Sequence, residues 1–310
     1  DAGARNLQGD RGTKYESSSD HEKNRLQTVR ITVHYSARYQ YAEKASFSPH
    51  RVRLFPRHDL FVKIERIAFA THASADVQYR HDLFDNVTAT CLYPGTLDEL
   101  DFELEFDAVF QARDPFHFIL DSHALRLPFE YLPEEAAVLA AFRHTSYKTG
   151  DLPAPLGASS PRPTVEALVA MNSWLHENIG YERREEGDPF SPKETLERQR
   201  GSCRDFAVLF AEVLRCHGLA ARLASGYLWE DGSHTGLGHA ENAFHAWVET
   251  FLPGAGWIGL DPTNGILCDH HFLVTAVGLT PRDITPILGR YYGKKTIAST
   301  LETGLSIVRS

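Results

Sequence analysis

The first half of the chain is built from short segments in which apolar and polar residues alternate. Val29, Ile31, Val33 and Tyr35 begin this pattern, each separated from the next by one polar residue. Further β-like runs, bounded by Pro, Asp and Gly, occupy residues 61–69, 76–79, 86–93 and 102–110. Alternation with a period of two is typical of strands with one buried face. Because no helical pattern separates these runs, they predict an antiparallel β-sandwich.

The second half of the chain changes to helical spacing. Leu168, Met171, Leu175 and Ile179 fall on one side of a helix that begins at Thr164, a residue suited to capping it. Ser191-Pro192-Lys193-Glu194 forms a capping box with proline at the first helical position, so a short helix is expected from there to Gly201.

A third helix is predicted over residues 203–217, where it ends at Gly218. Its expected buried stripe consists of Phe206, Leu209, Phe210, Val213 and Leu214. Strand patterns return at residues 220–229, 243–251 and 256–260. This mixture of helices and antiparallel strands predicts an α+β domain.

The patterns divide the chain into five parts. Residues 1–27 are polar and mixed in charge, which predicts a flexible tail. Residues 28–130 form the β-rich domain, and residues 131–163 are a connector with a short helix starting at Pro133 and a stretch rich in Pro, Gly and Ser. The α+β domain then covers residues 164–293, and a C-terminal tail covers residues 294–310.

Composition and charge restrict the classes of partner that the protein is expected to bind. The 310 residues carry a net charge of −9, which disfavours nucleic acid as a partner. No apolar run reaches the roughly 18–20 residues that a membrane span needs, and no secretory leader opens the chain at Asp1. The four cysteines contain no CxxC pair, so we expect free thiols in a reducing cytoplasm.

One of these cysteines stands where a nucleophile would be placed. Gly201-Ser202 ends one helix and Cys203 opens the next. The free N–H groups and the positive end of the helix dipole stabilise a thiolate there, and the same groups can bind an oxyanion. Taken alone, Cys203 is better explained as a small buried hydrophobic residue than as a nucleophile.

A histidine and an aspartate follow on two predicted strands. Pro253-Gly254-Ala255-Gly256 is typical of a hairpin turn, and His245 and Asp261 lie eight residues to either side of position 253. Symmetric pairing would place them directly opposite each other, about 5 Å apart. A carboxylate in that position orients an imidazole for acid–base catalysis. The simpler alternatives are a solvated histidine and, in Asp261-Pro262-Thr263-Asn264, a turn residue.

These motifs together resemble the bacterial transglutaminase-like family. The similarity rests on the segments 200–207 (RGSCRDFA), 245–249 (HAWVE) and 257–264 (WIGLDPTN), and on Tyr79-Arg80-His81-Asp82-Leu83-Phe84-Asp85-Asn86 in the β-rich half. In the last segment Asp85 replaces the glycine that is usual in the family. The resemblance implies a papain-like α+β catalytic domain after a β-sandwich, with Cys203, His245 and Asp261 as a catalytic triad.

The implied chemistry is acyl transfer from a peptide or protein amide through a thioester, without a cofactor. Hydrolysis, as in a cysteine protease, is the first expectation, and transglutaminase or deamidase activity shares the same intermediate. A binding or scaffold protein that retains the fold is the non-catalytic alternative. Gln199, four residues before Cys203, is a weak candidate for the second oxyanion donor.

Other polar residues are assigned structural roles. His234, His239, Cys268, His270 and His271 do not match a standard zinc spacing, so no metal site is expected. His239 and Glu241 are expected on a loop near the cleft. Trp247 and Trp257 are expected to pack in the core. The charged run at residues 183–186 is expected to be a solvated loop.

Overall fold

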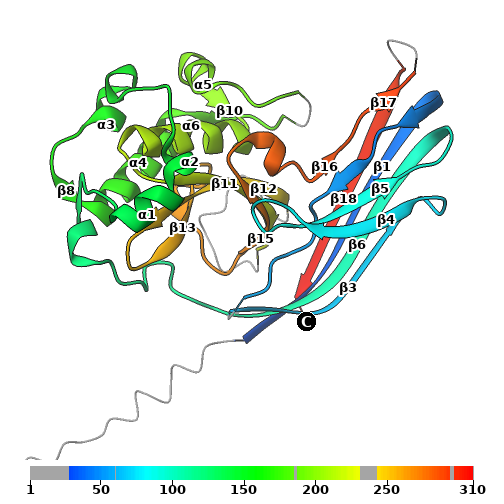
Figure 1. Cartoon of the computed structure of the whole chain (residues 1–310), viewed down its shortest axis with the longest axis horizontal. Coiled ribbons are helices and arrows are strands. Elements are labelled where there is room, and N and C mark those ends of the chain that lie inside the picture. The colour runs from blue at the N-terminus through cyan, green and yellow to red at the C-terminus, as the bar shows by residue number, and fades with distance from the viewer. Residues whose placement is uncertain (1–27, 60, 185–186, 231–242, 294–296, 310) are drawn as a thin grey trace, which may run out of the picture.

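The computed structural model describes residues 28–59, 61–184, 187–230, 243–293 and 297–309. Two layered parts lie side by side, a strand-only part and a part that combines helices with a sheet (Figure 1). The predicted tail at residues 1–27 and the residues His234, His239 and Glu241 lie outside the described residues.

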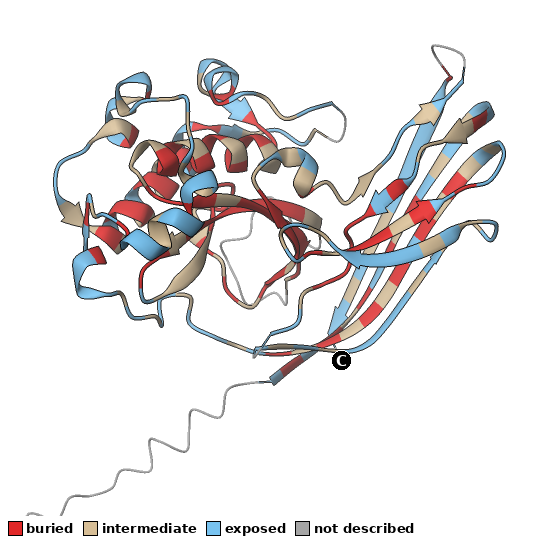
Figure 2. Cartoon of the chain, in the orientation of Figure 1, coloured by how far each residue is buried: buried red, intermediate tan, exposed pale blue. Residues whose placement is uncertain are grey.

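The strand-only part is the predicted β-sandwich. One sheet has the order β17-β1-β6-β3, with β18 also paired to β1, and the other has the order β16-β2-β5-β4. The strands from the N-terminal half are β1 (Thr28–Phe47), β2 (His50–Val52), β3 (Val62–Thr71), β4 (Asp76–His81), β5 (Val87–Leu92) and β6 (Leu97–Gln111). Buried residues line the space between the two sheets (Figure 2).

Strand β6 illustrates why the sequence forms this sandwich. Every second residue from Leu100 to Phe110 is buried, and the residues between them include Asp101, Glu103 and Glu105. The two kinds of side chain point to opposite faces of the pleated strand. The alternation at Val29–Tyr35 on β1 is buried in the same way, as predicted from the sequence.

The C-terminal segment is not a tail, contrary to the expectation for residues 294–310. Strands β16 (Ile287–Leu288), β17 (Tyr291–Tyr292) and β18 (Ser299–Arg309) return to the sandwich. Strand β16 pairs with β2, and both β17 and β18 pair with β1. The N-terminal β-domain is therefore completed by the end of the chain (Figure 1).

The second part contains a five-stranded antiparallel sheet in the order β14-β13-β12-β11-β15. Its strands are β11 (Ala221–Leu228), β12 (Ala243–Leu252), β13 (Gly256–Asp261), β14 (Ile266–Leu267) and β15 (Phe272–Gly278). Helices α4 (Thr164–Asn178), α5 (Pro192–Arg198) and α6 (Cys203–Cys216) accompany it. The apolar stripe of α6 packs against Ala246 and Val248 of the sheet in one core.

One helix boundary and one helix cap differ from the sequence expectation. Helix α5 ends at Arg198, because Gln199 adopts a left-handed conformation (φ 51°) that terminates the helix before Gly201 is reached. Helix α4 begins at Thr164, but the Thr164 hydroxyl donates to the carbonyl oxygen of Ala124 instead of capping its own helix.

The expected connector is part of the helical layer. Leu152 and Leu156 are buried in the same core as α4 and α6. The small elements between residues 122 and 163 are η1 (Ser122–Ala124), β7 (Arg126–Leu127), α1 (Pro133–Val138), α2 (Ala140–Arg143), η2 (Thr149–Asp151), α3 (Ala154–Gly157) and β8 (Arg162–Pro163). Further along lie β9 (Gly180–Tyr181), β10 (Arg200–Gly201) and η3 (Pro281–Asp283). The predicted helix at Pro133 is present as α1.

Candidate active site

Cys203 is the first residue of helix α6. Ser202 precedes it with extended backbone, and Asp205 reaches back so that its Oδ2 accepts a hydrogen bond from Ser202 N at 2.7 Å. The remaining N–H groups of the first turn point toward the Cys203 end of the helix. The helix terminus thus places the thiol of a half-buried cysteine in a field that favours negative charge.

Asp205 also binds the loop in front of the helix. Its side chain is fully buried, and its Oδ1 accepts from Arg184 Nη2 and from Phe190 N, both at 2.6 Å. The Arg184 guanidinium lies over the Phe190 ring, 3.8 Å from its centroid. The expectation of a solvated loop was therefore wrong for Arg184, because a buried carboxylate recruits it. Residues 185–186 lie outside the described residues.

His245 and Asp261 are brought together on the sheet. His245 Nε2 lies 3.0 Å from Asp261 Oδ2, and both side chains are buried. The pairing differs from the symmetric register that the sequence indicated. Leu252 pairs with Gly256 and Val248 with Leu260, so the centre of the hairpin is position 254.

This shift has a local cause and a limited effect. The loop contains three residues, with Gly254 at φ 85°, followed by Gly256 at φ 79°. Asp261 consequently lies beyond the Leu260 pair, diagonal to His245 and on the same face of the sheet. Direct opposition was wrong, but the predicted contact between the two side chains is present.

Asp261 is held in place by the turn that follows it. Its Oδ1 accepts from Thr263 N at 3.0 Å, and its Oδ2 accepts from Asn264 Nδ2 at 2.7 Å. Burial on its own would raise the pKa of Asp261, but the charge and hydrogen bond of His245, with those two donors, lower it. Asp261 is therefore a fixed carboxylate with one oxygen directed at the imidazole.

The imidazole of His245 connects this carboxylate to the thiol. Burial disfavours its protonation, but Asp261 and Cys203 outweigh burial and raise the pKa of His245 to about 10. Burial likewise opposes ionisation of Cys203, but hydrogen bonding to His245, its charge and the Ala246 N–H lower the pKa of the thiol. Because Nε2 of His245 faces Asp261, Nδ1 is the ring nitrogen that is left to interact with Cys203. The arrangement favours a thiolate–imidazolium pair.

The backbone beside His245 admits only a small residue. Gly226 of β11 pairs with His245, and a Cβ atom at position 226 would lie 1.9 Å from the carbonyl oxygen of Leu273. The register of β11 and β15 shifts at this point, between Ser225 and Gly226. The close approach brings β15 against β11, the strand that pairs with the one carrying His245.

Two aromatic side chains lie next to the His245 imidazole. The Trp247 ring is stacked on that of His245 at 6.4 Å between centroids, and the Phe272 ring lies 6.3 Å from it. Trp247 is 1% exposed, as its predicted core role requires. Phe272 and Asn264 were not recognised from the sequence as parts of the site. Asn264 was interpreted only as a turn residue, although its position three residues after Asp261 was the available signal.

The position of Gln199, the weak candidate for the second oxyanion donor, does not support that role. Gln199 is exposed and terminates α5. Tyr181, on β9, is closer to the site, because β9 runs parallel to β10 and pairs Tyr181 with Gly201. Burial and the charge of Cys203 both raise the pKa of Tyr181. Its position next to the residues before Cys203 was not predicted.

Two of the five candidate metal ligands, His270 and His271, form a cluster with Asp269. Asp269, His270 and His271 bring donor atoms within 4.8 Å of one another, and Cys268 is not among them. Asp269 Oδ1 accepts from His271 N and lies 2.9 Å from His271 Nδ1. This geometry is that of a turn in which an aspartate orients a histidine.

No helix in the described part of the chain has the length and apolarity to cross a membrane.

Comparisons with known proteins agree with this architecture. Residues 152–262 match the family model of the transglutaminase-like superfamily, and residues 31–108 match the bacterial transglutaminase-like N-terminal region. A crystal structure from Cytophaga hutchinsonii, of a protein provisionally named a cysteine protease, has a TM-score of 0.68 at 16% identity and covers 91% of each chain. The predicted fold class, a transglutaminase-like α+β domain after a β-sandwich, is confirmed.

Sequence relatives cover less of the chain. An uncharacterised protein of Mycobacterium tuberculosis is 35% identical over 138 residues, which is 42% of this chain and 43% of the relative. The protein-glutamine gamma-glutamyltransferase of Pseudomonas aeruginosa is 39% identical over 71 residues, 22% of this chain and 10% of that protein. These matches span less than half the length of the relatives.

Proposed function

The chain belongs to the transglutaminase-like superfamily, and from this premise we propose that it is a cysteine enzyme that hydrolyses peptide or protein amides through a thioester at Cys203. The observation that carries the proposal is the buried His245–Asp261 pair beside a thiol whose pKa is lowered at the start of α6. In this proposal Cys203 is the nucleophile, His245 the acid and base, and Asp261 the residue that orients His245.

The reaction begins with attack of the Cys203 thiolate on the amide carbon. The C=O π bond breaks, and its electron pair moves to the oxygen, where N–H groups at the α6 terminus are the available donors. The electron pair on the oxygen then re-forms the C=O bond as the C–N bond breaks, and His245 gives its proton to the leaving amine. A thioester remains on Cys203, and His245 is left neutral.

The second half of the reaction reverses these roles. Neutral His245 takes a proton from water as the water oxygen attacks the thioester carbon. The C–S bond breaks, the carboxylic acid leaves, and the thiolate–imidazolium pair is restored. Asp261 keeps its negative charge throughout and stabilises the imidazolium.

An amine in place of water would make the protein a transglutaminase. The 39% identity to the protein-glutamine gamma-glutamyltransferase of Pseudomonas aeruginosa favours this second candidate, over the 71 residues that match. The two activities share every step up to the thioester. They differ in whether water or a primary amine reaches its carbonyl carbon.

A peptide library tests the proposal when it is incubated with the protein, with and without a labelled primary amine. Backbone cleavage supports hydrolysis. Amine incorporation supports transglutaminase activity, and conversion of glutamine to glutamate supports deamidation; either one overturns hydrolysis of backbone peptide bonds as the main reaction. Product that persists at the wild-type rate in Cys203→Ser overturns the role of Cys203. Cys216→Ser is the matched control, because Cys216 lies at the other end of α6.

A further inference from the structure

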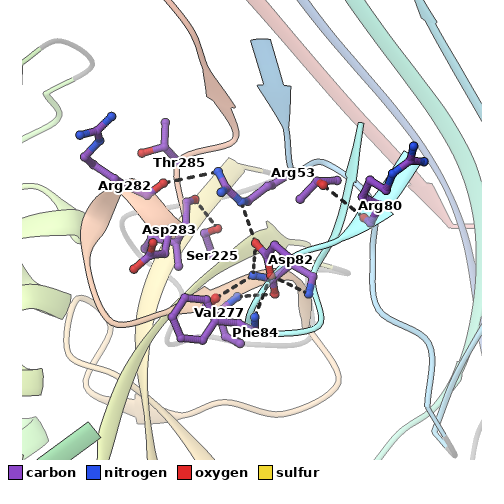
Figure 3. A network of polar contacts seen from close by, with 12 residues as sticks. Arg53, Arg80, Asp82, Phe84, Ser225, Val277, Arg282, Asp283 and Thr285 are labelled. Atoms are coloured by element: carbon purple, nitrogen blue, oxygen red, sulfur yellow. Dashed lines mark hydrogen bonds and ion pairs between the residues drawn. The ribbon is translucent and has the colours of Figure 1, made fainter. Parts of the chain in front are cut away.

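One turn of the β-sandwich forms hydrogen bonds to the five-stranded sheet that carries His245. Residues 82–86, between β4 and β5, form this turn, which we name the 82–86 turn (Figure 3). Asn86 is fully buried and reaches β15, where its Nδ2 donates to Val277 O at 2.8 Å and its Oδ1 accepts from Val277 N at 2.9 Å. A single side chain thereby makes both hydrogen bonds that a neighbouring strand would make with Val277.

Internal hydrogen bonds hold the turn in one conformation. Asp82 Oδ1 accepts from Phe84 N at 2.9 Å and Asn86 N at 3.1 Å, and its Oδ2 accepts from Asn86 Nδ2 at 3.1 Å. Asp85 has a φ of 62°, which an aspartate tolerates. The turn is therefore a preformed support with the Asn86 amide already oriented.

Arg53 and Arg57, which follow the β-sandwich strand β2, each donate hydrogen bonds to the 82–86 turn. The buried Arg53 lies 3.2 Å from Asp82 Oδ2 through its Nε and donates from Nη1 to Arg282 O of η3 at 3.4 Å. Arg57 Nη2 donates to Phe84 O at 2.7 Å. Arg53 thus links the turn to the segment after β15, so that β15 is held at Val277 and just beyond its end (Figure 3).

Phe84 connects the 82–86 turn to the side chains that lie next to the His245 imidazole. Its side chain packs against the cluster formed by Ala224, Leu228, Trp247, Phe272 and Val277. Trp247 and Phe272 are the two rings that lie against His245. Helix α6 packs on the opposite face of the sheet, against Ala246 and Val248. The 82–86 turn therefore reaches, through Phe84, the same face of the sheet that presents His245.

We propose that Phe84 and Asn86 are positioning residues of the catalytic site, which hold the Trp247–Phe272 surface so that His245 stays aligned with Cys203. The β-sandwich is then an integral part of the catalytic unit. This inference rests on the proposed function, because it assigns the two residues a role in activating the Cys203 thiol.

The test is the pH dependence of Cys203 alkylation by iodoacetamide in the full chain, with labelled peptides mapped by mass spectrometry. Phe84→Ala and Asn86→Ala are expected to slow alkylation at neutral pH by about tenfold and to move its midpoint toward the ordinary thiol pKa. Leu83→Ala is the matched control, because Leu83 lies in the same turn and is 91% exposed. Its profile should coincide with that of the wild type.

A loss of stability alone would not change a rate measured on folded protein. Phe84→Leu keeps most of the apolar volume and serves where Phe84→Ala does not fold; a smaller shift in the same direction supports the inference. Profiles that coincide with the wild type, whatever the change in unfolding temperature, overturn it. A wild-type Cys203 that reacts no faster than Cys216 at neutral pH overturns the proposed function instead.

Discussion

The protonation of His245 is decided by competing forces at one residue. Burial opposes the imidazolium, while the Asp261 carboxylate and the Cys203 thiolate favour it. The partners prevail because both lie within hydrogen-bonding reach in a site of low dielectric. His245 and Cys203 therefore ionise as a pair, and the charge on each maintains the charge on the other.

A pH profile of Cys203 alkylation is our first prediction. Since the pKa of the thiol is lowered, the reactive thiolate persists below the ordinary thiol range and is lost as pH falls through the lowered value. On the alkaline side the imidazolium loses its proton near pH 10, which ends its action as a general acid in turnover. Turnover against pH should therefore be bell-shaped, and alkylation should have only the acidic limb.

His245→Gln is the informative variant for this prediction. Removing the imidazole takes away the main groups that lower the pKa of Cys203 and leaves the burial that raises it. Alkylation at neutral pH should fall by about 10- to 100-fold, with the midpoint at or above the ordinary thiol value. An unchanged midpoint in His245→Gln would contradict the ion pair.

Residues of the site differ in how well their roles could be predicted. Cys203, His245 and Asp261 stood out because each sits at a position, a helix start or a predicted hairpin, where its chemistry is useful. Asn264 was missed because its turn geometry, and not its residue type, directs its amide to Asp261. Phe84 lies 161 positions from His245 in the chain, so only the tertiary fold relates them.

Among the elements, helix α6 depends on the buried carboxylate at its start. Asp205 receives four donors, two from Ser202 and one each from Arg184 and Phe190. It therefore fixes the first turn, where Cys203 lies, to the preceding loop. A buried carboxylate in this setting stabilises the fold through specific donors that lose their partner when it is removed.

Asp205→Ala is the second prediction. The variant should lower the free energy of unfolding by about 3–5 kcal/mol, because Arg184 and the Ser202 N–H lose a buried partner together. Urea denaturation followed by circular dichroism measures this change. Lys193→Ala is the control, since Lys193 and Glu197 form an exposed pair at 3.8 Å and their loss should leave the midpoint unchanged. Equal midpoints for both variants would refute the role of Asp205.

Element boundaries were predictable where a local signal sets them. The bounds of α6 follow from Ser202 before it and Gly218 after it, and the sequence placed them within one residue. The register of β12 and β13 was missed because Pro253-Gly254-Ala255-Gly256 is compatible with more than one loop length. A shift of the loop centre by one residue, from position 253 to 254, moves Asp261 from directly opposite His245 to a diagonal position.

At the scale of the whole molecule, the chain closes on itself. Strand β18 pairs with β1 over eleven positions, from Ile31 with Arg309 to Tyr41 with Ser299. Leu305 and Ile307 of β18 pack against the sandwich core. The sequence of this segment predicted only a tail, because its partner lies more than 250 residues away and its own residues are mostly exposed. Long-range pairing of this kind is not encoded in a local pattern.

Deletion of residues 299–310 is the third prediction. It removes the partial burial of Leu305 and Ile307, which should lower the free energy of unfolding by about 2–4 kcal/mol. It also exposes the edge of β1, so the truncated protein should associate at high concentration. Amide hydrogen exchange should accelerate along residues 31–41 of β1, where the pairing with β18 is lost.

The same deletion separates the two roles of the sandwich. Strand β18 lies on the sheet that contains β1 and β6, whereas the 82–86 turn belongs to the sheet that contains β4 and β5. Below the unfolding transition, Cys203 alkylation should therefore keep its wild-type pH profile in the truncated protein, although β1 exchanges faster. Leu301→Ala, at an exposed position of β18, is the control that should change neither measurement. Unchanged exchange in β1 would mean that β18 contributes nothing to the sandwich, and an altered alkylation profile would mean that the whole sandwich, not the 82–86 turn alone, aligns His245.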